Sequence, residues 1–254
     1  MRKSVRFRVF VNPDSASAQI AAEIAQLVRE RATLGRRALL GLVAGMSPRP
    51  LYEELIYLHR EEGLSFSNVV TFNVDEYAGL PLGHPASCRA VMQRILFDHI
   101  DIPPHHVNFL SSALPDEEIY AHCDSYDRKI ARLGGIDYLV LGIGRNGQIG
   151  LNEAGTPPTA RSRRATLDLA TRQDAVRFFG DIENVPTHGL TMGCGTILKA
   201  RRIALVAWGQ AKSSAIRKAA KGPVTAKHTA SYLQNHPLAS LYLDATAASL
   251  LKRK

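Results

Sequence analysis

Short apolar runs rich in β-branched residues alternate along the chain with longer stretches in which leucine, isoleucine and alanine recur at helical spacing. The apolar runs have the length of buried strands, and they are residues 7–11, 38–43, 69–74, 136–143, 203–208 and 238–243. The helical stretches between them are residues 15–32, 48–62, 85–97, 117–133 and 212–218. This alternation predicts an α/β fold with a doubly wound, mostly parallel, Rossmann-like sheet and helices on both faces.

Length and composition favour one folding unit. The chain has 254 residues, of which 45% are apolar and 22% are charged, so it can bury one large core. No internal repeat, low-complexity tract or long Gly/Ser linker divides it. We therefore expect a single domain over residues 1–254.

The cysteines and the chain start predict the compartment. Cys88, Cys123 and Cys194 are few and widely scattered, unlike a disulfide framework or a zinc site. The basic start Met1-Arg-Lys-Ser lacks the long apolar core of a signal peptide, and no apolar run is long enough to span a bilayer. We expect a cytoplasmic protein with no membrane partner.

The formal net charge of +9 suits either nucleic acid or an anionic small molecule. Its distribution favours the small molecule, because the basic residues are spread along the chain with few aromatics among them. The densest cluster is Arg161, Arg163 and Arg164. We also expect no metal, since the pair His105-His106 has no further ligands at suitable spacing.

Ligands of parallel α/β sheets bind beyond the carboxyl ends of the strands, so the loops there are the place to seek chemistry. One such loop, Gly142-Ile-Gly-Arg-Asn-Gly147, spells the dinucleotide pattern G-x-G-x-x-G. A dinucleotide site needs a helix that begins at the third glycine, whereas Asn152-Glu-Ala-Gly-Thr-Pro-Pro follows and would end any helix. We expect no nucleotide cofactor and assign no other.

Two longer motifs carry a family resemblance. Phe72-Asn-Val-Asp-Glu-Tyr-Ala-Gly-Leu-Pro81 is similar to the F-N-x-D-E-Y-x-G-L-P signature of glucosamine-6-phosphate deaminases, which convert glucosamine 6-phosphate to fructose 6-phosphate and ammonia. Gly142-Ile-Gly-Arg-Asn-Gly-Gln-Ile-Gly-Leu-Asn-Glu153 resembles the family's second signature, G-x-G-x-D-G-H-I-A-F-N-E. With weaker matches elsewhere, the resemblance covers residues 38–237.

The first motif supplies a candidate base. Conversion of an aldose to a ketose with loss of the amine requires a group that moves a proton between adjacent carbons. Asp75 follows an apolar strand, and the resemblance implies that it is the catalytic base. The alternative for an isolated Asp-Glu pair is that Asp75 or Glu76 only caps the next turn.

The second motif departs from the family. The resemblance implies a histidine that opens the sugar ring, but this chain has Gln148, whose amide does not titrate near neutral pH. Asn146 replaces the family's common aspartate, and Glu153, the partner of the missing histidine, is retained. We expect Gln148 and Asn146 to orient hydroxyl groups of the sugar.

Three interpretations of this departure stay open. Glu153 or a bound water opens the ring, which gives a slower isomerase and is the interpretation we favour. The substrate is instead an epimer, such as galactosamine 6-phosphate, or an already open sugar phosphate. Alternatively, the protein binds a sugar phosphate without converting it.

Phosphate binding is expected at a third loop and two cations. Ala44-Gly45-Met46-Ser47, just before Pro48, resembles the family's T-G-G-T-P phosphate loop with its first threonine replaced by Ala44. Arg177 and Lys212 occupy the family's phosphate-contact positions. Without the resemblance, each would be interpreted as a solvated surface cation.

The sequence therefore predicts an amino-sugar-phosphate deaminase that yields a ketose 6-phosphate and ammonia, with Asp75 moving a proton between C2 and C1. The rival enzyme is a hydrolase like 6-phosphogluconolactonase, whose loop resembles G-x-G-x-D-G-H-T-A-S-L-F-P, unlike Leu151-Asn152-Glu153 here. The non-enzymatic rival is a sugar-phosphate-binding protein. The sequence leaves monomer and homo-oligomer as alternatives.

Overall fold

A computed structural model describes residues 5–251, so the expectation for the basic chain start at residues 1–4 lies outside the described residues. Its main sheet contains seven parallel strands in the order β1-β10-β9-β6-β2-β3-β5. These strands are β1 (Arg6–Phe10), β2 (Ala38–Leu42), β3 (Val69–Asn73), β5 (Val107–Asn108), β6 (Tyr138–Leu141), β9 (Arg202–Ala207) and β10 (Ala239–Asp244). The predicted α/β fold with a mostly parallel sheet is confirmed.

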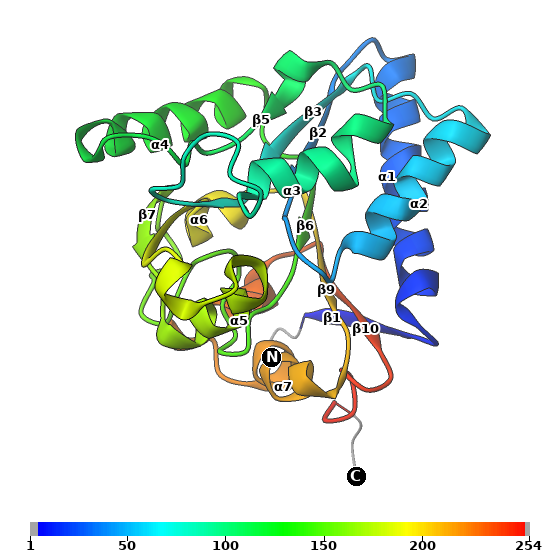
Figure 1. Cartoon of the computed structure of the whole chain (residues 1–254). Helices are drawn as coiled ribbons and strands as arrows, with labels where there is room; N and C mark the ends of the chain where they lie inside the picture. Colours follow the sequence, from blue (N-terminus) through cyan, green and yellow to red (C-terminus); the bar gives the residue numbers. More distant parts are fainter. Residues whose placement is uncertain (1–4, 252–254) are drawn as a thin grey trace.

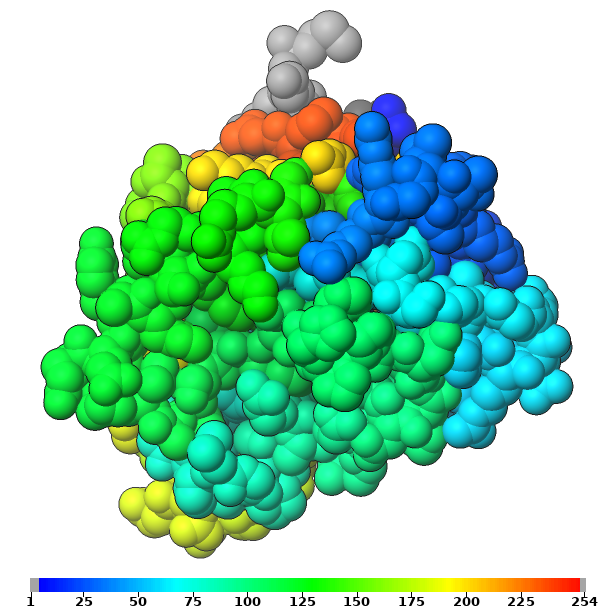
Figure 2. Space-filling model, turned by 90° about the horizontal axis from the view of Figure 1, so that it is seen from above, coloured from blue at the N-terminus to red at the C-terminus, as the bar shows by residue number. Residues whose placement is uncertain are grey.

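Helices cover both faces of this sheet (Figure 1). They are α1 (Pro13–Thr33), α2 (Arg49–Glu62), α3 (Cys88–Ile95), α4 (Asp116–Arg132), α5 (Leu169–Phe179), α6 (Cys194–Ile197) and α7 (Ser213–Lys221). Seen from above, the blue and cyan α1 and α2 pack side by side at one side of the molecule, and the green α4 lies at the other (Figure 2).

The alternating direction of side chains along each strand explains why the main sheet has a hydrophobic core on each of its two faces. On β2, Leu40 and Leu42 pack into the core with α1 and α2, whereas Leu39 packs into the core with α4 and α7. Successive side chains of a strand point to opposite faces, so a strand covered on both sides is apolar throughout. The continuous apolar runs of the sequence reflect this burial.

A second, three-stranded antiparallel sheet was not predicted. Its order is β4-β8-β7, formed by β4 (Asp75–Tyr77), β8 (His188–Thr191) and β7 (Arg163–Thr166). These strands are short and lack a long apolar run, so no pattern in the sequence predicts them. This sheet begins directly after β3 and holds Asp75 at the carboxyl edge of the main sheet.

The strand order reverses between β2 and β6. From β2 the sheet continues to β3 and β5, and from β6 it continues in the other direction to β9, β10 and β1. Loops that leave neighbouring strands in opposite directions open a crevice at such a point. The loops after β2 and β6 begin at Val43 and Gly142, so the expected phosphate loop and the second motif both leave the sheet at this point.

Candidate active site

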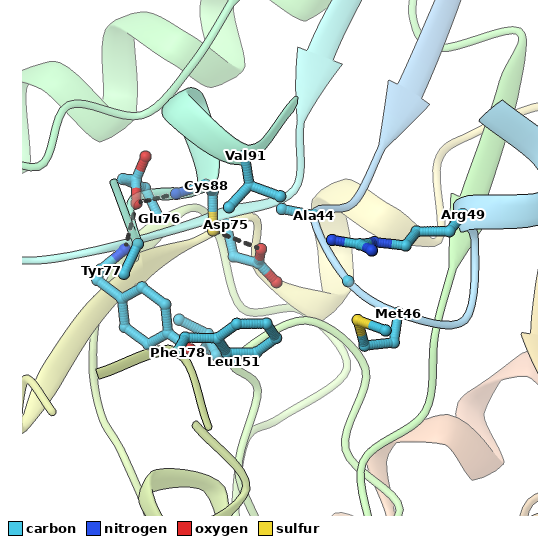
Figure 3. A pocket seen from close by; sticks show the side chains of 12 residues that line it. Ala44, Met46, Arg49, Asp75, Glu76, Tyr77, Cys88, Val91, Leu151 and Phe178 are labelled. Carbon is cyan, nitrogen blue, oxygen red and sulfur yellow. Dashed lines mark hydrogen bonds between the residues drawn. The ribbon is translucent and has the colours of Figure 1, made fainter. Parts of the chain in front are cut away.

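A pocket of about 110 Å³ lies at the carboxyl edge of the main sheet (Figure 3). Apolar side chains form much of its wall, with two acids and one guanidinium among them. Its lining residues are Ala44, Gly45, Met46, Arg49, Asp75, Glu76, Tyr77, Ala86, Cys88, Val91, Leu151 and Phe178. The structure therefore brings Asp75 together with Ala44, Gly45 and Met46 of the expected phosphate loop.

Asp75 presents its carboxylate to this pocket (Figure 3). Strand β4 holds its backbone opposite Thr191 of β8, and its Oδ1 accepts a hydrogen bond from Cys88 Sγ at 3.8 Å. Burial, followed by the negative charge of Glu76, raises the pKa of Asp75 to about 7, against the opposing effect of the Cys88 hydrogen bond. A carboxyl group with this pKa can accept and return a proton near neutral pH.

Glu76 has a different role. Its side chain is buried, and its Oε1 accepts hydrogen bonds from the backbone N–H groups of Tyr77 and Cys88, both at 2.8 Å. Its Oε2 accepts from the N–H of Arg89 at 2.9 Å, so the carboxylate satisfies the first amides of α3. The capping alternative from the sequence thus describes Glu76, and burial raises the pKa of Glu76 while these amides oppose the rise.

Ser47 lies on the expected phosphate loop but outside the pocket lining. It is partly exposed, and its backbone carbonyl accepts a hydrogen bond from Trp208 Nε1 at 2.8 Å. Pro48 stands immediately before α2, which begins at Arg49 without a side-chain cap. Trp208 therefore ties this loop to the carboxyl end of β9.

Gln148 and Glu153 are buried and linked through Thr171. The Thr171 hydroxyl donates to Glu153 Oε1 at 2.6 Å and accepts from Gln148 Nε2 at 2.8 Å. The Gln148 amide packs against Gly144, where a Cβ atom would lie 2.0 Å from Gln148 Oε1. Burial raises the pKa of the Glu153 carboxyl, with the Thr171 bond opposing the rise. Neither Gln148 nor Glu153 lines the pocket around Asp75.

The remaining expected residues surround the pocket without lining it. Asn146 is exposed, and its backbone carbonyl contacts His228 Nδ1 at 2.8 Å. Arg177 is exposed and stacks on Phe178, a pocket residue, with its guanidinium carbon 4.8 Å from the ring centre. Lys212 Nζ donates to the Ile143 carbonyl at 2.8 Å, and burial lowers the pKa of this lysine.

Sequence reasoning missed four residues near the site: Arg49, Cys88, Thr171 and Phe178. Arg49 follows Ser47-Pro48 directly, so its closeness to the phosphate loop was a usable signal. Cys88 lies 13 residues from Asp75, and Thr171 lies 18 residues from Glu153. No local pattern connects residues at those separations.

The described residues also bear on metal, dinucleotide and membrane sites. Within residues 5–251, no group of three or more His, Cys, Asp or Glu side chains is placed to hold a metal ion. His106, from the pair that the sequence analysis does not assign to a metal, is buried. Turns follow Gly147, and the next helix in the chain is α5. No helix in the described part of the chain is long and apolar enough to cross a bilayer.

A parallel α/β sheet that holds a carboxyl group with a pKa raised to about 7 at its carboxyl edge is suited to an enzyme that moves protons on a small substrate. Residues 11–241 match the family described as glucosamine-6-phosphate isomerases/6-phosphogluconolactonase, and the chain belongs to this family. Within it, the chain is a glucosamine-6-phosphate deaminase-like enzyme, as its similarity to individual members shows.

Among these members, glucosamine-6-phosphate deaminase of Pseudarthrobacter chlorophenolicus is 46% identical over 215 residues, 85% of this chain and 82% of that one. A glucosamine-6-phosphate deaminase-like protein of Bacteroides thetaiotaomicron is 39% identical over 96% of this chain, but the match spans only 37% of that longer protein. The solved structure of a monomeric glucosamine-6-phosphate deaminase has a TM-score of 0.91 and 38% identity, over 96% of this chain and 99% of that one.

The lactonase branch is more distant. The structure of 6-phosphogluconolactonase from Trypanosoma brucei covers 98% of this chain with a TM-score of 0.77 but only 16% identity. Such a likeness shows a common fold and nothing finer.

Proposed function

We propose that this enzyme converts glucosamine 6-phosphate, or an epimer such as galactosamine 6-phosphate, to a ketose 6-phosphate and ammonia. The observation that carries the proposal is the Asp75 carboxylate in the pocket, with a pKa raised to about 7. Asp75 removes the proton from C2 of the open-chain sugar and returns it to C1. Water then adds to the resulting imine at C2, and ammonia leaves.

Ring opening is assigned to Glu153 in this proposal. Burial raises the pKa of its carboxyl, which makes the protonated form easier to reach than in an exposed glutamate. Gln148 carries no titratable group and is fixed by Thr171, so it orients hydroxyl groups, and Asn146 does the same from the loop. Glu153 delivers its proton to the ring oxygen directly or through a water molecule.

The phosphate is assigned to the loop of residues 44–47 and to two cations. Arg177 is adjacent to Phe178 of the pocket wall, and Lys212 lies at the carboxyl end of β9. Burial lowers the pKa of Lys212 against the charge of Asp174, and the positive charge of Arg177 lowers it further, so the two cations lie in one region. A dianionic phosphate would relieve their mutual repulsion.

The decisive experiment measures ammonia release from glucosamine 6-phosphate and galactosamine 6-phosphate. The Asp75→Asn variant keeps the side-chain shape but loses the base, so we expect its kcat to fall on the order of 10²- to 10⁴-fold. Asp174→Asn is the matched control, because Asp174 is an exposed carboxylate on α5 that pairs with Arg145.

Each other result identifies an alternative. Full activity in Asp75→Asn would remove this base from the mechanism. No ammonia from the wild-type protein, together with binding of fructose 6-phosphate, would support the sugar-phosphate-binding protein. Hydrolysis of 6-phosphogluconolactone without ammonia release would support the lactonase.

A further inference from the structure

The pocket has opposite charges at its two sides. Asp75 and Glu76 supply the acids, but the Glu76 carboxylate is occupied by three backbone amides, which leaves Asp75 as the acid available to a ligand. Arg49 supplies the positive charge, and it is the only cation among the described residues that line the pocket.

The start of α2 places Arg49 in the wall of the pocket that contains Asp75. Its side chain extends from the first helical residue toward the middle of the pocket, beside Ala44 and with Asp75 on the far side (Figure 3). The residue is partly buried, and its guanidinium has no ion pair or hydrogen bond to any residue within 5–251. A partly desolvated guanidinium without a partner favours an anionic ligand.

The other groups assigned to the phosphate bring no second cation into the pocket lining. Ala44, Gly45 and Met46 line the pocket without a charged side chain. Lys212 Nζ donates to the Ile143 carbonyl, and Arg177 is exposed with its guanidinium over the Phe178 ring. Within the described chain, the cation that shares a cavity with Asp75 is therefore Arg49.

We propose that Arg49 binds the phosphate of the substrate in addition to the loop of residues 44–47, Arg177 and Lys212, and thereby orients the sugar with C1 and C2 toward Asp75. This inference rests on the proposed function and adds a residue that the family motifs do not assign. An amino-sugar phosphate carries an ammonium group near one end and a phosphate at the other, which matches a pocket with a carboxylate facing a guanidinium. A guanidinium also fits phosphate with two parallel hydrogen bonds.

Direct binding tests the proposal independently of turnover. The probes are fructose 6-phosphate and inorganic phosphate, measured by calorimetry, and the variants are Arg49→Met and Arg49→Lys. Loss of a charge-assisted contact raises the Kd for fructose 6-phosphate on the order of 10- to 100-fold in Arg49→Met. Arg49→Lys keeps the charge but not the paired geometry, so its Kd falls between the two. Arg60→Met is the control, since Arg60 lies on the same helix, exposed and next to His99.

Kinetics provide a second measurement. With glucosamine 6-phosphate, Arg49→Met raises KM by a similar factor, whereas the Arg60→Met control leaves KM at the wild-type value. An unchanged Kd for fructose 6-phosphate in a folded Arg49→Met protein would overturn the proposal, and so would a wild-type protein that binds neither probe. Wild-type phosphate binding that depends on Arg49, without any ammonia release, would reject the proposed function and leave the Arg49 assignment standing.

Discussion

Two adjacent acids with the same chemistry have different roles because of strand geometry. On β4, Asp75 and Glu76 point to opposite sides, so one carboxylate meets the pocket and the other meets the start of α3. The sequence offered a base and a helix cap as alternatives for this pair. The structure gives one role to each residue, and it places the capping charge where it raises the pKa of Asp75.

The pH dependence of activity follows from this arrangement. The Asp75 carboxyl is protonated below its pKa of about 7 and can act as a base only above it, so kcat/KM should rise with pH through an acidic limb near pH 7. Glu76→Gln removes the neighbouring negative charge and should move the limb to lower pH. Ser87→Ala removes an uncharged cap of the same helix and should leave the limb in place. A limb that does not respond to Glu76→Gln would contradict the assignment to Asp75.

Thr171 changes the interpretation of Gln148. The sequence suggested that replacing histidine leaves half of a proton shuttle, with Glu153 lacking its partner. In the structure, the Thr171 hydroxyl fills the space between Gln148 and Glu153 and bonds to both. The retained glutamate is therefore held in place by α5 instead of by an imidazole.

At the scale of elements, helix α3 is anchored from outside its own sequence. Two residues satisfy its first amides: Glu76 bonds to the N–H groups of Cys88 and Arg89, and Ser87 Oγ accepts from the N–H of Ala90 at 3.1 Å. The helix is short, so these bonds fix its start against β4 and keep Cys88 next to Asp75.

Loss of this anchor should destabilise the protein measurably. Glu76→Ala leaves three amides without their acceptor, and we expect the free energy of unfolding to fall by about 3 kcal/mol. Ser87→Ala removes one capping bond and should cost about 1 kcal/mol. Urea denaturation of the two variants checks the order. Equal losses would mean that water replaces the Glu76 carboxylate at little cost.

At the scale of the whole molecule, one buried acid connects elements that are distant in sequence. Asp137, just before β6, forms ion pairs with Arg31 of α1 and with Arg201, and it accepts a hydrogen bond from the N–H of Leu39 at 3.0 Å. Its side chain is only 3% exposed. The contact joins α1, β2 and the approach to β9 at the amino edge of the sheet, opposite the pocket.

Removal of Asp137 should therefore affect global stability and leave the site intact. We expect Asp137→Ala to lower the free energy of unfolding by about 3 kcal/mol, because it leaves two arginines and one backbone amide without their acceptor. Asp124→Ala is the control, because Asp124 pairs only with the exposed Arg128 and Arg161, and it should cost under about 1 kcal/mol. The stability of both variants is measured by thermal unfolding, and their KM for glucosamine 6-phosphate is measured alongside. A large rise in KM with Asp137→Ala would contradict the separation of stability from binding.

The sequence by itself determined the alternation of strands and helices that builds the main sheet, its parallel arrangement, the family and the position of Asp75 after a buried strand, but not the short strands β4, β5, β7 and β8. Periodicities and motifs among neighbouring residues predict these features. Only the tertiary structure decided which acid faces the pocket, that Thr171 joins Gln148 to Glu153, and that Arg49 shares a cavity with Asp75. Those contacts depend on strand pairing and on how helices pack across the sheet, and pairing between distant segments leaves no local pattern in the sequence.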